Sequence, residues 1–117
     1  MLPKNNRLTK TKDFDNVYKK GRNFFTKILG IKYIKNELDM TRIGLVISQK
    51  ISKKAVVRNK TKRRLREILR LRLSNIHKGY DIIILTRKGI EDCDYAEIEK
   101  NIEYALNKTH LIFSDKG

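Results

Sequence analysis

The chain lacks tryptophan, has one proline and one cysteine, and is poor in acidic side chains. Because Cys93 has no second cysteine to pair with, an internal disulfide is excluded, and a reducing, cytoplasmic location is predicted. No apolar run approaches the roughly 18 residues of a membrane-spanning helix, and the N-terminal residues lack the apolar core of a signal peptide. The sequence therefore predicts neither a secreted disulfide-rich domain nor a membrane protein.

Positive charge is what the chain has in excess: 28 Lys and Arg residues oppose 13 Asp and Glu residues, for a net charge of +15. Such a balance favours a polyanionic partner, which could be nucleic acid, an anionic membrane or an acidic protein. Hydrophobic residues make up 39% of the chain, enough for one modest core. We therefore predict a single domain over 1–117, with an irregular basic arm at 1–10.

Apolar periodicity predicts an α+β two-layer sandwich with the order α-β-β-α-β-α, in which helices cover one side of a sheet. Phe14, Val17 and Tyr18 share one face of a short helix that Gly21 ends. The predicted elements are helices over 11–20, 55–76 and 95–107 and strands over 24–35, 42–48 and 81–86.

Charge is concentrated in residues 50–72, where eleven Lys and Arg residues face the single acid Glu67. In the predicted helix over 55–76, an apolar stripe that includes Leu65 and Leu69 packs on the sheet and leaves the cations outside. Like charges spaced this closely repel one another, so a bound polyanion would relieve them. A membrane-surface helix would need no strands, so nucleic acid is the favoured partner.

Three stretches resemble the protein subunit of bacterial ribonuclease P: "RLTKTKDFDNVYKKG", "SQKISKKAVVRNKTKRRLRE" and "GYDIIILTRKG". They keep that family's order and spacing over roughly 7–89. The family's Arg-Asn-Arg core is Arg58-Asn59-Lys60 here, so Lys60 keeps the charge but loses the bidentate fork of arginine.

The resemblance implies a ribosomal-protein-like fold with a left-handed βαβ crossover through the strands at 42–48 and 81–86. It implies an endoribonuclease whose chemistry belongs to an RNA subunit, with Mg²⁺ acting through that RNA. The implied partners are ribonuclease P RNA and precursor tRNA, whose 5′ leader is removed. Neither a membrane nor an obligate protein partner is expected.

The predicted contacts to the catalytic RNA are cations of the basic helix and of its flanking loops, together with one asparagine. A basic pair before Gly89 is included because turns often present such pairs at a sheet edge. These residues are Lys50, Lys53, Lys54, Arg58, Asn59, Lys60, Lys62, Arg63, Arg66, Arg87 and Lys88.

A leader is single-stranded, and single strands bind where aromatic rings and cations line one groove. The predicted leader-binding residues are Phe14, Val17, Tyr18, Lys32 and Arg42. The apolar members fit core packing as well, and Lys32 stands where some relatives carry an aromatic residue. No catalytic or metal-binding residue is predicted in the protein.

Three other functions fit the sequence less well. A protein nuclease would need paired carboxylates or a partnered histidine, and neither His77 nor His110 lies in such a motif. A structural RNA-binding protein, such as a ribosomal protein, fits the composition equally and is distinguished only by the three matching stretches. A DNA-binding protein would need a helix that reads bases from its N-terminal end, a role that Arg58 and Asn59 could serve. The sequence shows no dimerisation element or second recognition module to accompany such a helix.

Overall fold

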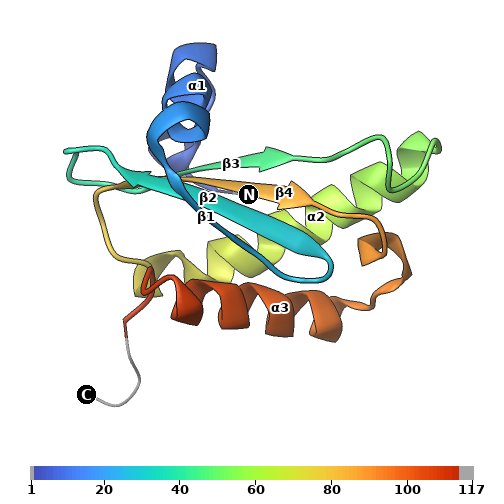
Figure 1. Cartoon of the computed structure of the whole chain (residues 1–117). Coiled ribbons are helices and arrows are strands. Elements are labelled where there is room, and N and C mark those ends of the chain that lie inside the picture. The colour runs from blue at the N-terminus through green and yellow to red at the C-terminus, as the bar shows by residue number, and fades with distance from the viewer. Residues whose placement is uncertain (1, 114–117) are drawn as a thin grey trace.

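Four strands form one sheet in the order β1-β2-β4-β3, and three helices surround it (Figure 1). The computed structural model describes residues 2–113. The strands are β1 (Arg22–Phe25), β2 (Leu29–Lys35), β3 (Arg42–Val46) and β4 (Tyr80–Thr86); the helices are α1 (Thr11–Lys20), α2 (Ala55–Arg72) and α3 (Tyr95–Lys108). Three single 3₁₀ turns, η1 (Lys4–Asn6), η2 (Leu73–Asn75) and η3 (Ile90–Asp92), complete the chain.

The sheet is mixed. β2 pairs antiparallel with both β1 and β4, whereas β3 pairs parallel with β4. Because β3 and β4 are parallel neighbours, α2 must carry the chain back along the sheet as a crossover. The α+β single domain is therefore confirmed, while the left hand of the crossover stays a prediction.

The predicted strand over 24–35 is wrong in one respect, because it is a hairpin of β1 and β2. The observed order is consequently α-β-β-β-α-β-α. Thr26 reverses the chain: its backbone N–H donates to the carbonyl of Leu29 at 2.8 Å, and its hydroxyl accepts from the backbone N–H of Ile28. The turn contains no Gly, Pro, Asn or Asp, so the usual sequence signal of a hairpin is missing.

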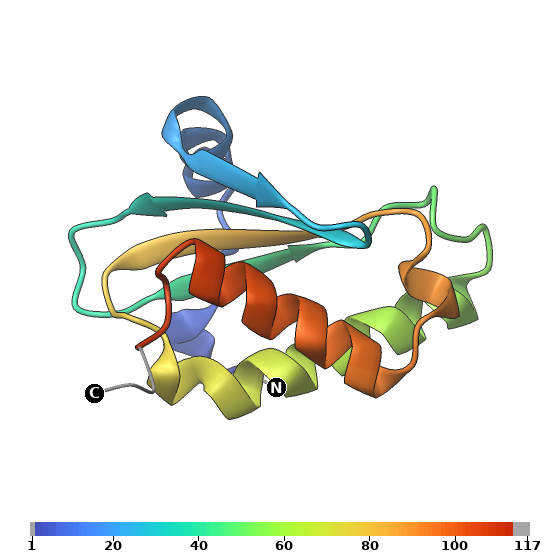
Figure 2. The same ribbon diagram turned by 60° about the horizontal axis from the view of Figure 1, so that its bottom comes forward.

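The sequence predicted that all helices cover one side of the sheet, and this is wrong, because the helices lie on both sides. α2 and α3 lie side by side on one face, where Leu65, Ile68 and Ile102 pack against strand residues such as Ile84 (Figure 2). α1 crosses the opposite face, where Val17 packs with Ile83. Period-2 alternation shows that a strand has two faces but does not say which helix covers each.

Helix ends lie close to the predicted positions. α3 begins with a capping box in which Asp94 accepts from the backbone N–H of Glu97 and the Glu97 carboxylate accepts from that of Asp94. α2 ends at Arg72, and the turn η2 replaces the predicted last residues of that helix. No helix in the described part of the chain is long and apolar enough to cross a bilayer.

The N-terminal segment is packed rather than a free arm. Leu2 and Leu8 are buried, and the Leu8 backbone N–H donates to the carbonyl of Ile43 at 3.0 Å. Asn6 donates through its side chain to the carbonyl of Thr41 at 2.8 Å. This segment therefore covers part of the outer edge of β3.

Candidate nucleic-acid interface

The cations of α2 divide by the side of the helix from which they project. On the side facing α3, Arg72 pairs with Glu99 at 2.9 Å and with Glu103 at 3.0 Å, and Arg64 donates to the carbonyl of Cys93. Burial lowers the pKa of Arg72, but the hydrogen bond and charge of Glu103 together with the charge of Glu99 outweigh it, so that the pKa is raised. Arg72 thus links α2 to α3, and Arg64 holds the segment just before α3.

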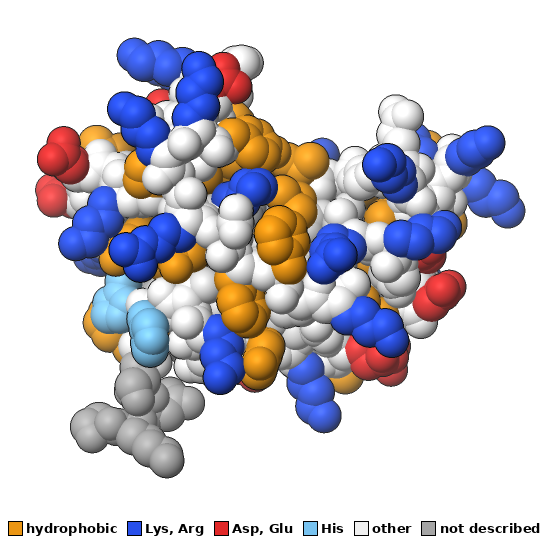
Figure 3. All heavy atoms as spheres, in the orientation of Figure 1, with side chains coloured by type: hydrophobic (Ala, Val, Ile, Leu, Met, Phe, Trp, Pro, Cys, Tyr) orange, Lys and Arg blue, Asp and Glu red, His pale blue; other side chains and the backbone are white. Residues whose placement is uncertain are grey.

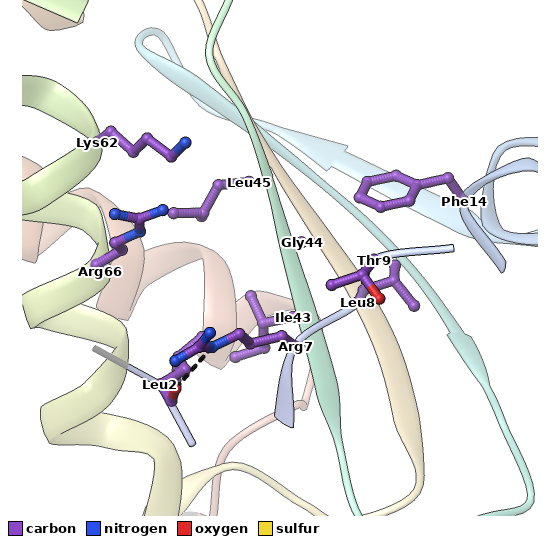
Figure 4. Close-up of a pocket in the computed structure, with 10 residues that line it drawn as sticks. All are labelled: Leu2, Arg7, Leu8, Thr9, Phe14, Ile43, Gly44, Leu45, Lys62 and Arg66. Carbon is purple, nitrogen blue, oxygen red and sulfur yellow. Dashed lines mark hydrogen bonds between the residues drawn. The ribbon is translucent and has the colours of Figure 1, made fainter. Parts of the chain in front are cut away.

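A second side of α2 turns its cations toward the edge of β3. Lys62 and Arg66 point across a cavity of about 190 Å³ whose wall also includes Arg7 from the N-terminal segment (Figure 4). Its apolar lining comes from β3 and the N-terminal segment, and none of its ten lining residues is acidic. The ring of Phe14 lies on the opposite side of β3 from α2, so this edge cavity reaches both faces of the sheet (Figure 4).

The remaining predicted α2 contacts lie at its exposed N-terminal part. Asn59, Lys60 and Arg63 are exposed there. Arg58 donates from Nη1 to the carbonyl of Ser52 at 2.8 Å, so it also braces the loop before the helix. Lys50, Lys53 and Lys54 are exposed in that loop and extend the basic surface.

Arg87 and Lys88 lie beside this loop. Together with Lys27 and Lys50 they line one small groove. Lys88 pairs with Glu91 at 3.1 Å, and Arg87 donates to the carbonyl of Thr26 at 2.8 Å. Burial alone would raise the pKa of Glu91, but hydrogen bonds from the backbone and from Lys88 lower it.

The sheet face beneath α1 carries aromatic rings laid over glycines. A Cβ on Gly44 would lie 2.5 Å from the Phe14 ring, and one on Gly30 would lie 2.6 Å from the Phe25 ring. Both rings therefore need glycine underneath them to lie this close to the strands. Phe14 was predicted from the sequence, whereas Phe25 was missed because it was placed inside one continuous strand.

Cations alternate with these rings. The Lys32 ammonium lies 5.7 Å from the Tyr18 ring centroid and 5.6 Å from that of Phe25, and the Arg87 guanidinium lies 5.4 Å from the Phe25 ring. Tyr18 and Phe25 are each 45% exposed, so both rings keep a face open to solvent. We call Phe14, Tyr18, Phe25, Lys32 and Arg87 the ring face. Figure 3 shows apolar side chains below α1 with Lys and Arg among them.

Two other predicted leader contacts make interactions within the fold. Val17 is 1% exposed and belongs to the core beneath α1. Arg42 forms ion pairs with Asp81 at 2.7 Å and with Asp13 at 3.1 Å, and its hydrogen bond with Asp81 is the main cause of its raised pKa. The structure thus places Phe14, Tyr18 and Lys32 on one face, buries Val17 and holds Arg42, whose side chain is 22% exposed, in ion pairs; leader binding by Arg42 stays a prediction.

Comparison with known proteins identifies the family of this chain. The family model described as Ribonuclease P matches residues 2–110. The chain belongs to the ribonuclease P protein family. The Ribonuclease P protein component of Clostridium acetobutylicum is 37% identical over 115 residues, covering 97% of this chain and 96% of that protein. That of Alkaliphilus oremlandii is 40% identical over 109 residues, covering 93% and 95%.

Solved structures give the same result. The ribonuclease P protein of Staphylococcus aureus superposes with a TM-score of 0.85 at 31% identity, covering 92% of this chain and 98% of the other. That of Thermotoga maritima gives 0.79 at 31% identity, covering 87% and 96%. The family resemblance read from the sequence is confirmed, as is the prediction of a protein subunit of an RNA-based endoribonuclease in tRNA processing.

Membership of the ribonuclease P family implies partnership with ribonuclease P RNA. Among residues 2–113, no group of three or more His, Cys, Asp or Glu side chains is arranged to share a metal ion. Cys93 is half-buried, and burial is the largest cause of its raised pKa, which disfavours the reactive thiolate.

Proposed function

We propose that this chain binds ribonuclease P RNA through the exposed cations of α2 and its flanking loops, and binds the 5′ leader of precursor tRNA on the ring face. The RNA subunit would then remove the leader with Mg²⁺ held by RNA. The protein's own residues would bind and orient the substrate strand. They would carry no step of the chemistry.

The observation that carries this proposal is the edge cavity. It brings Phe14 of the ring face together with Lys62 and Arg66 of α2 around one edge of the sheet. A single strand could stack a base on the ring and place its phosphates near the cations. The two predicted surfaces, leader-binding and RNA-binding, would then be continuous.

The test compares precursor tRNA with mature tRNA as ligands of the reconstituted RNA–protein complex. Tyr18→Ala with Phe25→Ala removes two half-exposed rings, so the fold should survive. We expect affinity for precursor tRNA to fall by about 1–3 kcal/mol for each stacked base lost, with mature tRNA unaffected.

Tyr104→Ala is the matched control, because Tyr104 is 53% exposed but lies on α3, beyond the other face of the sheet. Equal losses for the two tRNA ligands would refute leader binding by these rings. So would an effect of Tyr104→Ala as large as that of the ring-face pair.

A further inference from the structure

A second cationic surface lies where β2 ends and β4 begins, and it shares no residue with the ring face or with α2. Two adjoining hollows meet there and have Lys35, Tyr80 and His110 in common. We call this the histidine groove. Its charged and titratable residues are Lys20, Arg22, Tyr33, Lys35, Glu37, His77, Lys78, Tyr80 and His110.

Both histidines of the chain line this groove. Figure 3 shows them next to each other, with Lys and Arg side chains beside them. The His77 ring packs on Phe113 with centroids 4.1 Å apart, and its backbone N–H donates to the carbonyl of Leu111 at 2.7 Å. An antiparallel bridge between Ile76 and Ile112 brings the segments that carry the two histidines together.

Four cations converge on the groove from four different segments, and Glu37 is its only acid. Within residues 2–113, none of Lys20, Arg22, Lys35 and Lys78 has a carboxylate within ion-pair distance. Most cations of residues 2–113 share this condition, since only Arg42, Arg70, Arg72 and Lys88 have such a partner. Cations near a helix C-terminus are favoured by the helix dipole, which accounts for Lys20 and His110. It does not account for Lys35 or Lys78, which lie at no helix end.

Backbone conformation sets the groove apart as well. Four described residues have positive φ, and three of them line it: Glu37 at 62°, Gly79 at 91° and His110 at 59°. Left-handed conformations of residues other than glycine persist only where the surroundings enforce them, and they gather at ligand sites. The left-handed backbone at Glu37 and His110 and the convergence of four cations with a single acid are independent observations that indicate one binding site.

We propose that the histidine groove binds backbone phosphates of RNA, and does so more tightly as the pH falls. Ammonium, guanidinium and imidazolium groups all make charge-assisted hydrogen bonds to phosphate. Histidine is the side chain that ordinarily changes charge between about pH 5 and pH 8. The charged groups that line the groove with His77 and His110 are the four cations and Glu37, and Tyr33 and Tyr80 are its other titratable residues. A bound phosphate would offset the cations, so binding would take up protons.

The proposal rests on the proposed function only in taking RNA as the partner. The experiment measures binding of the full chain to ribonuclease P RNA at several salt concentrations, at about pH 6 and about pH 8. Each phosphate contact adds roughly one unit to the slope of log affinity against log salt. We expect a steeper slope at the lower pH, and we expect His77→Gln with His110→Gln to abolish that difference.

Lys35→Gln with Lys78→Gln should lower the slope by about two units at both pH values. Lys12→Gln with Lys100→Gln removes the same charge from exposed sites outside both hollows and is the control. Equal slopes for the two lysine pairs would overturn the proposal, as would a pH difference that survives loss of both histidines.

Two further outcomes keep this proposal separate from the α2 interface. If Lys62→Gln with Arg66→Gln weakens binding while the groove variants do not, the α2 interface stands and the groove proposal fails. If only the groove variants weaken binding, the groove proposal stands and the α2 interface fails. Binding of anionic phospholipid vesicles that depends on Lys35 and Lys78, without such dependence for RNA, would also overturn the proposal.

Discussion

At the scale of single residues, Asp81 and Asp13 share one partner but differ in burial. Both pair with Arg42, yet the Asp81 side chain is 4% exposed and that of Asp13 is 22% exposed. Asp81 also accepts a hydrogen bond from the Asn36 amide at 2.9 Å. Removing a buried partner leaves charged and polar groups unsatisfied, whereas a more exposed pair is replaced by water.

We therefore expect Asp81→Ala to lower the free energy of unfolding by about 3–5 kcal/mol. Asp13→Ala should lower it by no more than about 1 kcal/mol. Urea denaturation of the two variants checks this. Similar losses of unfolding free energy in the two variants would show that burial does not decide how much each ion pair of Arg42 stabilises the fold.

Gly44 is the second residue with a decisive position, because the Phe14 ring lies directly over it. Gly44→Ala should push that ring away, which would weaken leader binding by about 1 kcal/mol, the lower end of the worth of one stacked base. The measurement is the ratio of affinities for precursor and mature tRNA. In a Phe14→Ala background the same substitution should have little effect, so additive losses would contradict this account.

At the scale of elements, α2 separates two kinds of cation. Arg72 pairs with α3 and Arg64 bonds to the segment before it, whereas Lys62 and Arg66 face the edge cavity. We expect Lys62→Gln with Arg66→Gln to reduce the salt slope of RNA binding by about two units without loss of stability. Lys12→Gln with Lys100→Gln should leave the slope nearly unchanged. An equal decrease in the salt slope for both double variants would indicate that RNA binding responds to net charge alone.

The sequence predicted the helices well because their apolar residues recur at 3.6-residue spacing, as Leu65, Ile68 and Leu69 show in α2. It did not predict the hairpin, because Thr26 makes the turn through hydrogen bonds that leave no glycine or proline signal. Nor did it predict the role of Phe25, since that depends on which residue lies beneath the ring. Nor did it predict the ion pair of Arg42, because its buried partner, Asp81, is 39 residues away in the chain.

At the scale of the whole molecule, the sheet has two outer edges that are protected in different ways. β1 is only four residues long and begins with Arg22, and short charged edges discourage pairing with another chain. β3 has the N-terminal segment against its outer edge, through Leu8 and the bridge between Arg7 and Ile43. The unpaired groups of β3 would otherwise be open to a second molecule.

A variant lacking residues 2–9 should therefore self-associate while keeping its helices. Sedimentation or light scattering at increasing protein concentration would show this, with circular dichroism to confirm the helix content. The full chain is the control and should stay monomeric over the same range. A variant that remained monomeric would show that the N-terminal segment is not needed to protect β3.

The same segment also lines the edge cavity with Arg7, Leu8 and Thr9, so protection of the edge and occupation of the cavity are thermodynamically linked. A strand of RNA that contacted these residues would bind only molecules in which the N-terminal segment covers β3. Mass action would then add about 2.7 kcal/mol to the stability of that form at a free RNA concentration one hundred times the dissociation constant. Protein made in excess of RNA would lack this stabilisation by bound RNA. The aggregation-prone species is then the unassembled subunit, and the supply of RNA sets how much of it persists.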